Sequence, residues 1–324
     1  MNSSNSKILV IRFSSFGDIV QAMEVLAPLE GQIDWVTRRE FCPLVELNSK
    51  VNKVWGLERS TGLLGLLRLA RQLRGQGYTH IYDAHSNLRS GILRCYFRLT
   101  FSGAKILRRK KDRLKRFLLF KLGINKFSWP FRGRVSYLEA LKDWGIKSLT
   151  TTQSWKFPEQ FSKQLAEHHD ALVLVPSAAW EMKRWPLENW KELISIVKHP
   201  KIIVLGGPGD EFCSELEGLD PKRVTNLAGK LSLTESAYIL STASNFVSAD
   251  TGLLHVGDLL GVSGLSLIGP TAFGFPSGDN VKILESDLSC RPCSKDGRGG
   301  CSREIYQECM LAITPEVVAK ALAP

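Results

Sequence analysis

The chain has 324 residues, of which 44% are hydrophobic and 23% charged, as in a globular protein with enough apolar material for two cores. This composition excludes a disordered chain, a collagen and a coiled coil as descriptions of the whole protein. No apolar run approaches the roughly 20 residues of a membrane-spanning helix. No signal peptide is recognisable, so we expect a cytoplasmic protein.

The net charge of +11 is distributed unevenly along the chain. Residues 1–150 contain 27 Lys and Arg against 11 Asp and Glu, whereas residues 151–324 contain 16 against 21. The excess is densest over residues 89–134, where fifteen basic residues accompany one acidic residue. Such an asymmetry suggests that the amino-terminal half faces an anionic partner.

The centre of this basic stretch, residues 105–116, runs directly into the apolar residues 117–120. Three interpretations are open: a solvated helix face, a nucleic-acid patch, or a surface for anionic lipid and its phosphorylated head groups. The interleaved Leu and Phe favour the lipid surface. No zinc-finger, RNA-binding or helix-turn-helix signature accompanies the patch, which places nucleic acid last. The candidate anionic-surface residues are Arg108, Arg109, Lys110, Lys111, Arg113, Lys115 and Arg116.

Short β-rich apolar runs alternate with amphipathic stretches along most of the chain. The first half predicts strands over 7–13, 33–36 and 80–83, with helices over 18–29 and 63–73. After a Thr- and Ser-rich joint near 148–154, the second half predicts strands over 171–175, 202–205, 246–248 and 263–268, with helices over 186–197, 233–242 and 252–260. This alternation indicates parallel sheets built from βαβ units. We therefore expect two doubly wound α/β domains, residues 1–150 and 151–324, with ligands at the carboxyl ends of the strands in a central cleft.

The first candidate site follows the first predicted strand and reads Arg12-Phe-Ser-Ser-Phe-Gly-Asp18. Gly17 allows a sharp turn, and Ser14 and Ser15 lie in the strand-to-helix loop. Asp18 stands where the helix begins, so it is either a cap matched to the helix dipole or a general base. The loop is not G-x-G-x-x-G, and no G-x-x-x-x-G-K-[ST] occurs, which argues against a dinucleotide dehydrogenase and a P-loop NTPase.

Two segments of the second half are candidate anion sites. Lys183 and Arg184 stand just before Pro186, a natural first-turn residue, where cations beside helix amides can hold a diphosphate. An exposed basic loop is the alternative there. The segment Ser248-Ala-Asp-Thr-Gly-Leu-Leu-His-Val256 offers a second helix amino terminus. Its candidate residues are Asp250 for sugar hydroxyls, Thr251 and Gly252 for an anion, and His255, which is equally well a structural histidine.

Gly-rich turns follow two further strands, Gly206-Gly-Pro-Gly-Asp210 and Gly269-Pro-Thr271. Asp210 either meets a ribose or caps the next helix.

In order and spacing, these segments resemble glycosyltransferase family 9, the ADP-heptose:lipopolysaccharide heptosyltransferases. The family opens with R-x-S-S-x-G-D, continues with K-R/H-W-P, and then carries D-T/S-G-x-x-H followed by G-P-T. The resemblance covers nearly the whole chain and implies the GT-B fold, two Rossmann-like domains. It assigns the acceptor to the amino-terminal domain and the nucleotide sugar to the carboxyl-terminal domain, in agreement with the charge asymmetry.

The resemblance implies inverting transfer of a heptose from ADP-heptose to the lipopolysaccharide inner core. Asp18 would deprotonate the acceptor hydroxyl, Lys183 and the amides of 251–253 would stabilise the departing ADP, and Asp250 would hold the heptose. No metal or other cofactor is required. One departure from the family pattern concerns binding of the donor diphosphate. Ser177 is followed by two alanines, where the family often has hydroxyl residues that bind the diphosphate. Another nucleotide sugar, or an epimerase on the same fold, is the alternative.

Seven cysteines in a cytosolic chain do not indicate a disulfide framework. Four of them cluster late in the chain, and their spacing permits zinc or an iron–sulfur cluster but also a group of reduced thiols in a loop packed on the donor domain. These four are Cys290, Cys293, Cys301 and Cys309. The expected partners are the lipopolysaccharide core acceptor and, peripherally, the anionic inner face of the inner membrane, with no nucleic acid.

Overall fold

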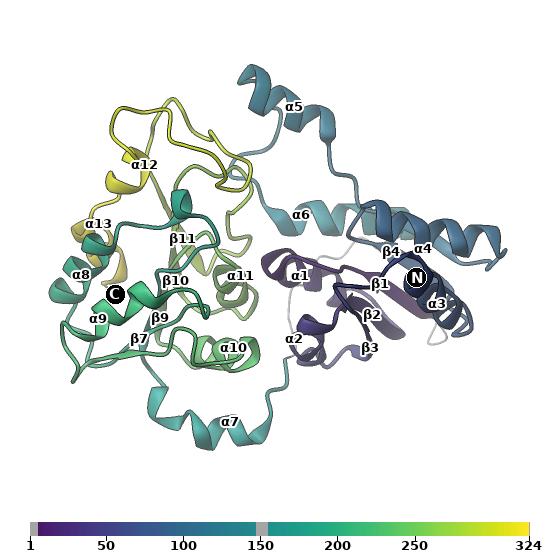
Figure 1. Ribbon diagram of the computed structural model, residues 1–324, viewed down its shortest axis with the longest axis horizontal. Coiled ribbons are helices and arrows are strands. Elements are labelled where there is room, and N and C mark those ends of the chain that lie inside the picture. The colour runs from purple at the N-terminus through teal and green to yellow at the C-terminus, as the bar shows by residue number, and fades with distance from the viewer. Residues whose placement is uncertain (1–5, 147–154, 324) are drawn as a thin grey trace. The chain divides into compact units, whose positions relative to one another are not determined.

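The computed structural model describes residues 6–146 and 155–323, which divide into two compact units (Figure 1). The first unit contains residues 1–112 and 134–156, and the second contains residues 113–133 and 157–324. The joint predicted near 148–154 lies outside the described residues. No helix in the described ranges is long and apolar enough to cross a membrane.

The first unit is built on a sheet of five parallel strands in the order β3-β2-β1-β4-β5. Its central strand β1 carries four fully buried residues, as expected for a parallel strand covered on both faces. The strands are β1 (Lys7–Ile11), β2 (Gln32–Arg38), β3 (Val51–Leu57), β4 (His80–Asp83) and β5 (Lys105–Arg108). The helices are α1 (Phe16–Met23), α2 (Cys42–Glu46), α3 (Leu63–Arg74), α4 (Leu88–Leu99) and α6 (Gly133–Leu138).

Helices α3 and α4 pack side by side and contribute one face of the core of this unit. The apolar stripe of α3 repeats at helical spacing, so Leu66, Leu69 and Leu73 all point inward. α4 begins at a capping box in which Asn87 and Ser90 exchange hydrogen bonds. This cap fixes where the chain leaves β4, and therefore where the residues between them lie.

The second unit contains a sheet of six parallel strands in the order β11-β10-β9-β6-β7-β8. In Figure 1, α8, α9 and α13 lie on one side of this sheet and α10 and α11 on the other. The strands are β6 (Leu172–Val175), β7 (Ile202–Val204), β8 (Val224–Asn226), β9 (Asn245–Ala249), β10 (Gly264–Ile268) and β11 (Val281–Glu285). The helices are α5 (Arg113–Leu122), α7 (Glu159–Gln164), α8 (Leu187–Ile196), α9 (Ser214–Glu217), α10 (Leu233–Ser241), α11 (Gly252–Leu259), α12 (Glu308–Leu311) and α13 (Pro315–Leu322).

Residues 113–133 belong to the second unit although they interrupt the sequence of the first. The reason is an aromatic cluster: Phe120, Phe127 and Phe131 all pack edge-on against Phe273, with ring centroids 4.9–5.9 Å apart. Arg132 adds a hydrogen bond of 2.7 Å to the Pro276 carbonyl. The division therefore differs from a single boundary at residue 150. Because this segment holds six basic and no acidic residues, the first unit carries +11 and the second is neutral.

The basic stretch 105–116 is split between three conformations. Residues 105–108 form the edge strand β5, a loop follows, and α5 begins only at Arg113. Ile106 and Leu107 explain the strand, because they pack into the sheet beside β4. The predicted helix over 18–29 is also shorter: α1 ends at Met23 and a 3-10 turn follows over Glu24–Leu26.

Candidate functional site

Both sheets are doubly wound, and each has one point where the strand order reverses. In the first sheet this point lies between β1 and β4, and in the second between β6 and β9. Ligands of such folds bind outside the carboxyl ends of the strands at these points. Asp18 follows β1 in the first turn of α1, and His85 lies in the loop after β4. Lys183 ends a 3-10 turn that follows β6, and Asp250 comes directly after β9. Each unit therefore has one candidate site, and each is described separately.

Asp18 lies in the first turn of α1, with its side chain 42% exposed. One carboxylate oxygen, Oδ2, lies 2.6 Å from an Arg12 guanidinium nitrogen and accepts a hydrogen bond from the Ser15 hydroxyl at 2.9 Å. The other, Oδ1, accepts from the Tyr137 hydroxyl at 3.2 Å. Gly17 is the second residue of α1, so the sharp turn predicted at this glycine is wrong: the residue is helical.

Arg12 and Arg109 are both buried and both stack on Tyr137, whose ring centroid lies 5.8 Å and 3.6 Å from their guanidinium carbons. Arg12 also donates to the Ala84 carbonyl at 3.0 Å, and Arg109 to the Ser136 hydroxyl at 2.9 Å. Arg109 had been predicted on the anionic surface. Its exposure is only 6%, because it packs on Tyr137 instead of facing solvent. It belongs to the Asp18 site.

The electrostatics of this cluster keep Asp18 ionised. Withdrawal from water alone would raise the pKa of its carboxyl, but the charges of Arg12 and Arg109 and the Ser15 hydrogen bonds hold that pKa far below the ordinary range. Burial raises the pKa of the Tyr137 hydroxyl, which therefore stays protonated and can donate to Asp18. The site thus presents an ionised carboxylate, both of whose oxygens are oriented by donors.

His85, two residues after the end of β4, is a neighbour of this cluster that sequence reasoning missed. Its Nδ1 accepts a hydrogen bond from the Phe13 backbone N–H at 3.3 Å, and its ring lies 5.2 Å from the Phe13 ring. Burial lowers its pKa to about 3, and the charges of Arg12 and Lys111 act in the same direction. The imidazole is therefore neutral with its proton on Nε2, so it is a hydrogen-bond donor there. One sequence signal could have identified His85: it closely follows the strand predicted over 80–83, at the end of a strand where ligands bind in such folds.

In the second unit, Asp250 is the buried centre of the candidate donor site. It accepts a hydrogen bond from the Thr271 hydroxyl at 2.6 Å and pairs with the Lys183 ammonium at 3.2 Å. Burial would raise the pKa of Asp250, but the Lys183 charge and the Thr271 hydrogen bond outweigh it and lower that pKa. Gly274 packs so closely here that an added Cβ would lie 2.0 Å from the carboxylate carbon. The loops after β6, β9 and β10 thus converge on one ionic group.

Asp210 ties neighbouring loops together. Its Oδ2 accepts from the Ser177 hydroxyl and, at 2.7 Å, from the Gly207 backbone N–H, while its Oδ1 lies 3.4 Å from Arg184. Arg184 in turn donates to the Ala178 carbonyl at 3.0 Å. Asp210 makes no side-chain cap to the following 3-10 turn. Its carboxylate therefore holds Ser177 and Arg184 in position.

The amino terminus of α11 has the form predicted from the sequence. Thr251 is the N-cap residue, its hydroxyl accepting from the Leu253 backbone N–H at 3.0 Å, and Gly252 is the first helical residue. His255 is 5% exposed and contributes to the field that lowers the pKa of Asp250. The helix terminus therefore adds positive potential beside Asp250.

The four late cysteines are free thiols: Cys290, Cys293 and Cys301 lie in the long segment after β11, and Cys309 lies in α12, whose flanking residues contact Glu181 and Trp185. Gln307 donates to the Glu181 carbonyl at 2.6 Å, and Trp185 donates to the Ile313 carbonyl at 2.8 Å. Burial raises the pKa of Cys309 to about 11, which keeps that thiol protonated. Across residues 6–146 and 155–323, no three His, Cys, Asp or Glu side chains are grouped as a metal site requires.

Comparison with known proteins shows which family this chain matches. The sequence profile of glycosyltransferase family 9 (heptosyltransferase) matches residues 66–299. Lipopolysaccharide heptosyltransferase 1 of Pseudomonas aeruginosa is 26% identical over 317 residues, covering 89% of this chain and 86% of that protein. Lipopolysaccharide heptosyltransferase 2 of Escherichia coli is 23% identical over 352 residues, covering 98% and 97%.

Two solved structures share the fold across nearly the whole chain. A family 9 glycosyltransferase from Veillonella parvula superposes with a TM-score of 0.76 at 19% identity, covering 99% of this chain and 97% of that one. The ADP-heptose lipopolysaccharide heptosyltransferase II of E. coli gives 0.71 at 18% identity, covering 98% and 97%. These likenesses confirm two Rossmann-like domains of the GT-B type.

Proposed function

Since the chain belongs to glycosyltransferase family 9, the heptosyltransferase family, and is a glycosyltransferase, we propose that it transfers a heptose from ADP-heptose to the lipopolysaccharide inner core. The observation that carries the proposal is the Asp18 carboxylate: ionised, oriented by three side chains, and 42% exposed at the carboxyl edge of its sheet. The names of the relatives above support the choice of donor and acceptor.

In the proposed reaction Asp18 is the general base. It takes the proton of an acceptor hydroxyl while that oxygen attacks the anomeric carbon of the donor. The bond between this carbon and the β-phosphate oxygen breaks, and ADP leaves with the electron pair. A single displacement of this kind inverts the anomeric configuration. Arg12 and Tyr137 are positioning residues that fix the carboxylate, and the uncharged Nε2–H of His85 is a donor for an acceptor oxygen.

The leaving group acquires negative charge, and the second unit offers positive groups for it. Lys183 has ammonium protons left beyond its contact with Asp250, and the α11 amino terminus adds backbone N–H groups. Asp250 is proposed to hold heptose hydroxyls. Because these cations and helix dipoles can neutralise the charge of the departing diphosphate, we propose that no divalent metal or other cofactor takes part. The first unit is the proposed acceptor domain, and the second the proposed nucleotide-sugar domain.

The acceptor is anchored in a membrane, and α5 is the proposed point of peripheral contact. One face of α5 packs on its own unit through Leu119, Phe120 and Arg116, the last 4.1 Å above the Phe273 ring. Leu114 and Phe117, which neighbour each other on the helix surface by their i, i+3 spacing, are 71% and 55% exposed. Basic residues flank this exposed apolar pair, as in helices that lie in an anionic interface.

Calorimetric titration with ADP, UDP and GDP, with and without EDTA, tests the donor assignment. The proposal predicts selective binding of ADP that is indifferent to EDTA. A preference for UDP or GDP would overturn the donor, and binding abolished by EDTA would overturn metal independence.

A further inference from the structure

The long segment after β11 contains a closed turn directly after Cys293. Its residues, 294–298, are called the Ser294 turn. The Ser294 hydroxyl closes it by accepting from the Gly297 backbone N–H at 2.9 Å and donating to the Arg298 carbonyl at 3.2 Å. Ser294 is 9% exposed and Gly297 is buried. The turn is therefore packed into the second unit, although it carries none of the four late cysteines itself.

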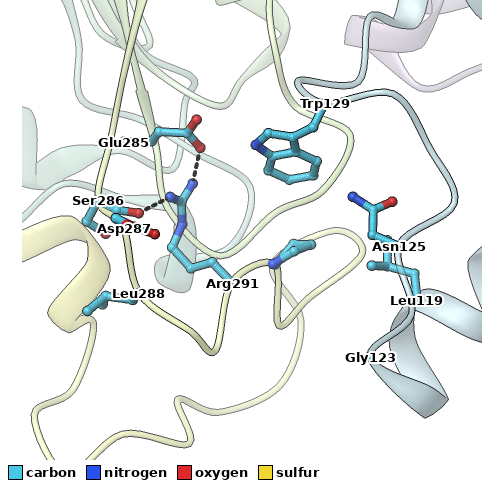
Figure 2. Close-up of a pocket in the computed structure, with 10 residues that line it drawn as sticks. Leu119, Gly123, Asn125, Trp129, Glu285, Ser286, Asp287, Leu288 and Arg291 are labelled. Carbon is cyan, nitrogen blue, oxygen red and sulfur yellow. Dashed lines mark hydrogen bonds and ion pairs between the residues drawn. The ribbon is translucent and has the colours of Figure 1, made fainter.

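Arg291 anchors the chain just before the Ser294 turn. Its guanidinium donates to the Ile268 carbonyl at 2.9 Å and to the Gly269 carbonyl at 2.7 Å, at the end of β10. Figure 2 shows the same guanidinium bonded to the Glu285 carboxylate, at 2.8 Å. The Arg291 side chain is only 6% exposed. Because it precedes the turn by so few residues, this anchor ties the start of the turn to the end of β10.

One side of the Ser294 turn bonds to the loop that holds Asp250. The Ser294 backbone N–H donates to the Pro270 carbonyl at 3.0 Å, and its carbonyl accepts from the Ala272 N–H at 3.3 Å. These two bonds form a short parallel bridge across Thr271, which lies between Pro270 and Ala272. The Thr271 hydroxyl donates to the Asp250 carboxylate at 2.6 Å. The turn therefore fixes the backbone from which Thr271 reaches Asp250.

The other side of the turn packs on the methylene stem of Lys183. Gly297 has a φ of +89°, and a Cβ at this position would lie 2.6 Å from Lys183 Cγ and Cδ and 3.2 Å from Trp180 Cβ. Glycine suits both the backbone conformation and the close approach. The next residue, Arg298, lies 5.1 Å from the centroid of the Trp180 ring. The turn thus confines the stem whose ammonium lies 3.2 Å from Asp250.

We propose that the Ser294 turn positions the ion pair of the donor site, and that Gly297 and Ser294 are positioning residues. One turn holds both partners of the pair, since Gly297 contacts the Lys183 stem and Ser294 brackets the threonine bonded to Asp250. A lysine side chain is otherwise free to rotate, so a confined stem places the ammonium before a diphosphate arrives. This inference rests on the proposed function, because it takes Lys183 to bind the diphosphate of the donor.

Two glycines of this segment offer a matched pair of variants. Gly297 and Gly299 both have positive φ, +89° and +100°, but a Cβ at Gly299 would meet nothing within 4 Å. Both alanine variants therefore strain the backbone, and only Gly297→Ala also displaces Lys183. The Lys183 side chain is 13% exposed, so an amine-reactive ester, read by peptide mass spectrometry, should label it about fivefold faster in Gly297→Ala than in wild type or Gly299→Ala. Lys191, which pairs with two glutamates, is the internal reference and should be labelled equally in all three proteins.

The dissociation constant for ADP measures the consequence for the donor site. It should rise about tenfold in Gly297→Ala and less than about twofold in Gly299→Ala. Ser294→Ala, which opens the turn without adding an atom, should raise it about threefold and tests the proposal even if Gly297→Ala does not fold. Lys183 labelling that is equal in all variants, or ADP affinities in Gly297→Ala and Ser294→Ala that match Gly299→Ala, would overturn the positioning role. A wild type that binds no ADP, while its Lys183 labelling still depends on Gly297, would overturn the proposed donor alone.

Discussion

The Arg12 guanidinium lies 2.6 Å from the Asp18 carboxylate, and both residues belong to one sequence motif that spans the end of β1 and the first turn of α1. Arg12 is 4% exposed and is held in turn by the Ala84 carbonyl. The strand therefore fixes the cation, and the cation fixes the carboxylate. An ion pair in this position sets the protonation state of the proposed base.

The first prediction concerns the pH dependence of turnover. Because Arg12 lowers the pKa of Asp18, the acid limb of kcat/KM should lie below the ordinary aspartate pKa of about 4. Ionised Asp18 is lost only as the pH falls through its lowered pKa, so Arg12→Gln should move the acid limb to higher pH. Arg12→Lys keeps a charge and should move the limb less. An unmoved limb in a folded Arg12→Gln protein would contradict the electrostatic account.

A second prediction concerns the pair of Lys183 with Asp250, both of which are largely buried. Lys183→Met leaves an uncompensated carboxylate and should lower the free energy of unfolding by about 3–5 kcal/mol. Adding Asp250→Asn should restore most of that stability without restoring turnover, because the cation for the leaving group is still missing. Denaturant unfolding and ADP release measure the two effects. Recovered turnover in the double variant would remove Lys183 from the proposed chemistry.

The close approach of Gly274 to Asp250 gives a third prediction. A Cβ at this position would overlap the carboxylate, whereas one at Gly300 would meet nothing within 4 Å. Gly274→Ala should therefore displace Asp250, cost about 1–3 kcal/mol of stability and weaken ADP binding. Gly300→Ala is the matched control and should bind ADP normally. Equal ADP affinities in the two variants would show that the arrangement of Asp250 does not affect the donor site.

The fourth prediction tests the contact of α5 with anionic lipid. Replacing Leu114 and Phe117 by Ser should reduce cosedimentation with vesicles of phosphatidylglycerol and phosphatidylethanolamine several-fold. The same change at Leu219 and Val317, which are each 49% exposed elsewhere in the second unit, is the control. Both proteins should have unchanged melting temperatures. Vesicle binding that survives in the α5 variant but falls at high salt would assign the contact to charge alone.

Much of the fold follows from the sequence because buried parallel strands read as short apolar runs. The strands ending at Ile11, Asp83, Val175 and Ile268 were all located by that signal. The strand over Val51–Leu57 was not, since only its last residue is buried and Asn52, Lys53 and Gly56 interrupt its apolar residues. The edge strand at Lys105–Arg108 was missed because its two apolar residues stand inside a run of charges.

Site residues that stand in local sequence motifs were predicted, whereas site residues that come from distant segments of the chain were missed. Asp18, Lys183 and Asp250 all lie between the end of a strand and the first turn of the helix that follows, which the order of elements reveals. Tyr137 and Arg109 reach the Asp18 site only because distant segments pack together, and nothing local distinguishes Arg109 from the charges beside it. The docking of residues 113–133 on Phe273 likewise needs the three-dimensional structure.

Transfer of radiolabelled heptose from ADP-heptose to heptose-deficient lipopolysaccharide, in wild type and Asp18→Asn, tests the central claim most directly. Asp143→Asn, an exposed aspartate in the same unit, is the control. The account predicts transfer by the wild type and the control, and a loss of about 10²–10⁴-fold in Asp18→Asn with ADP affinity retained. No transfer by the wild type, or normal transfer by Asp18→Asn, would contradict it.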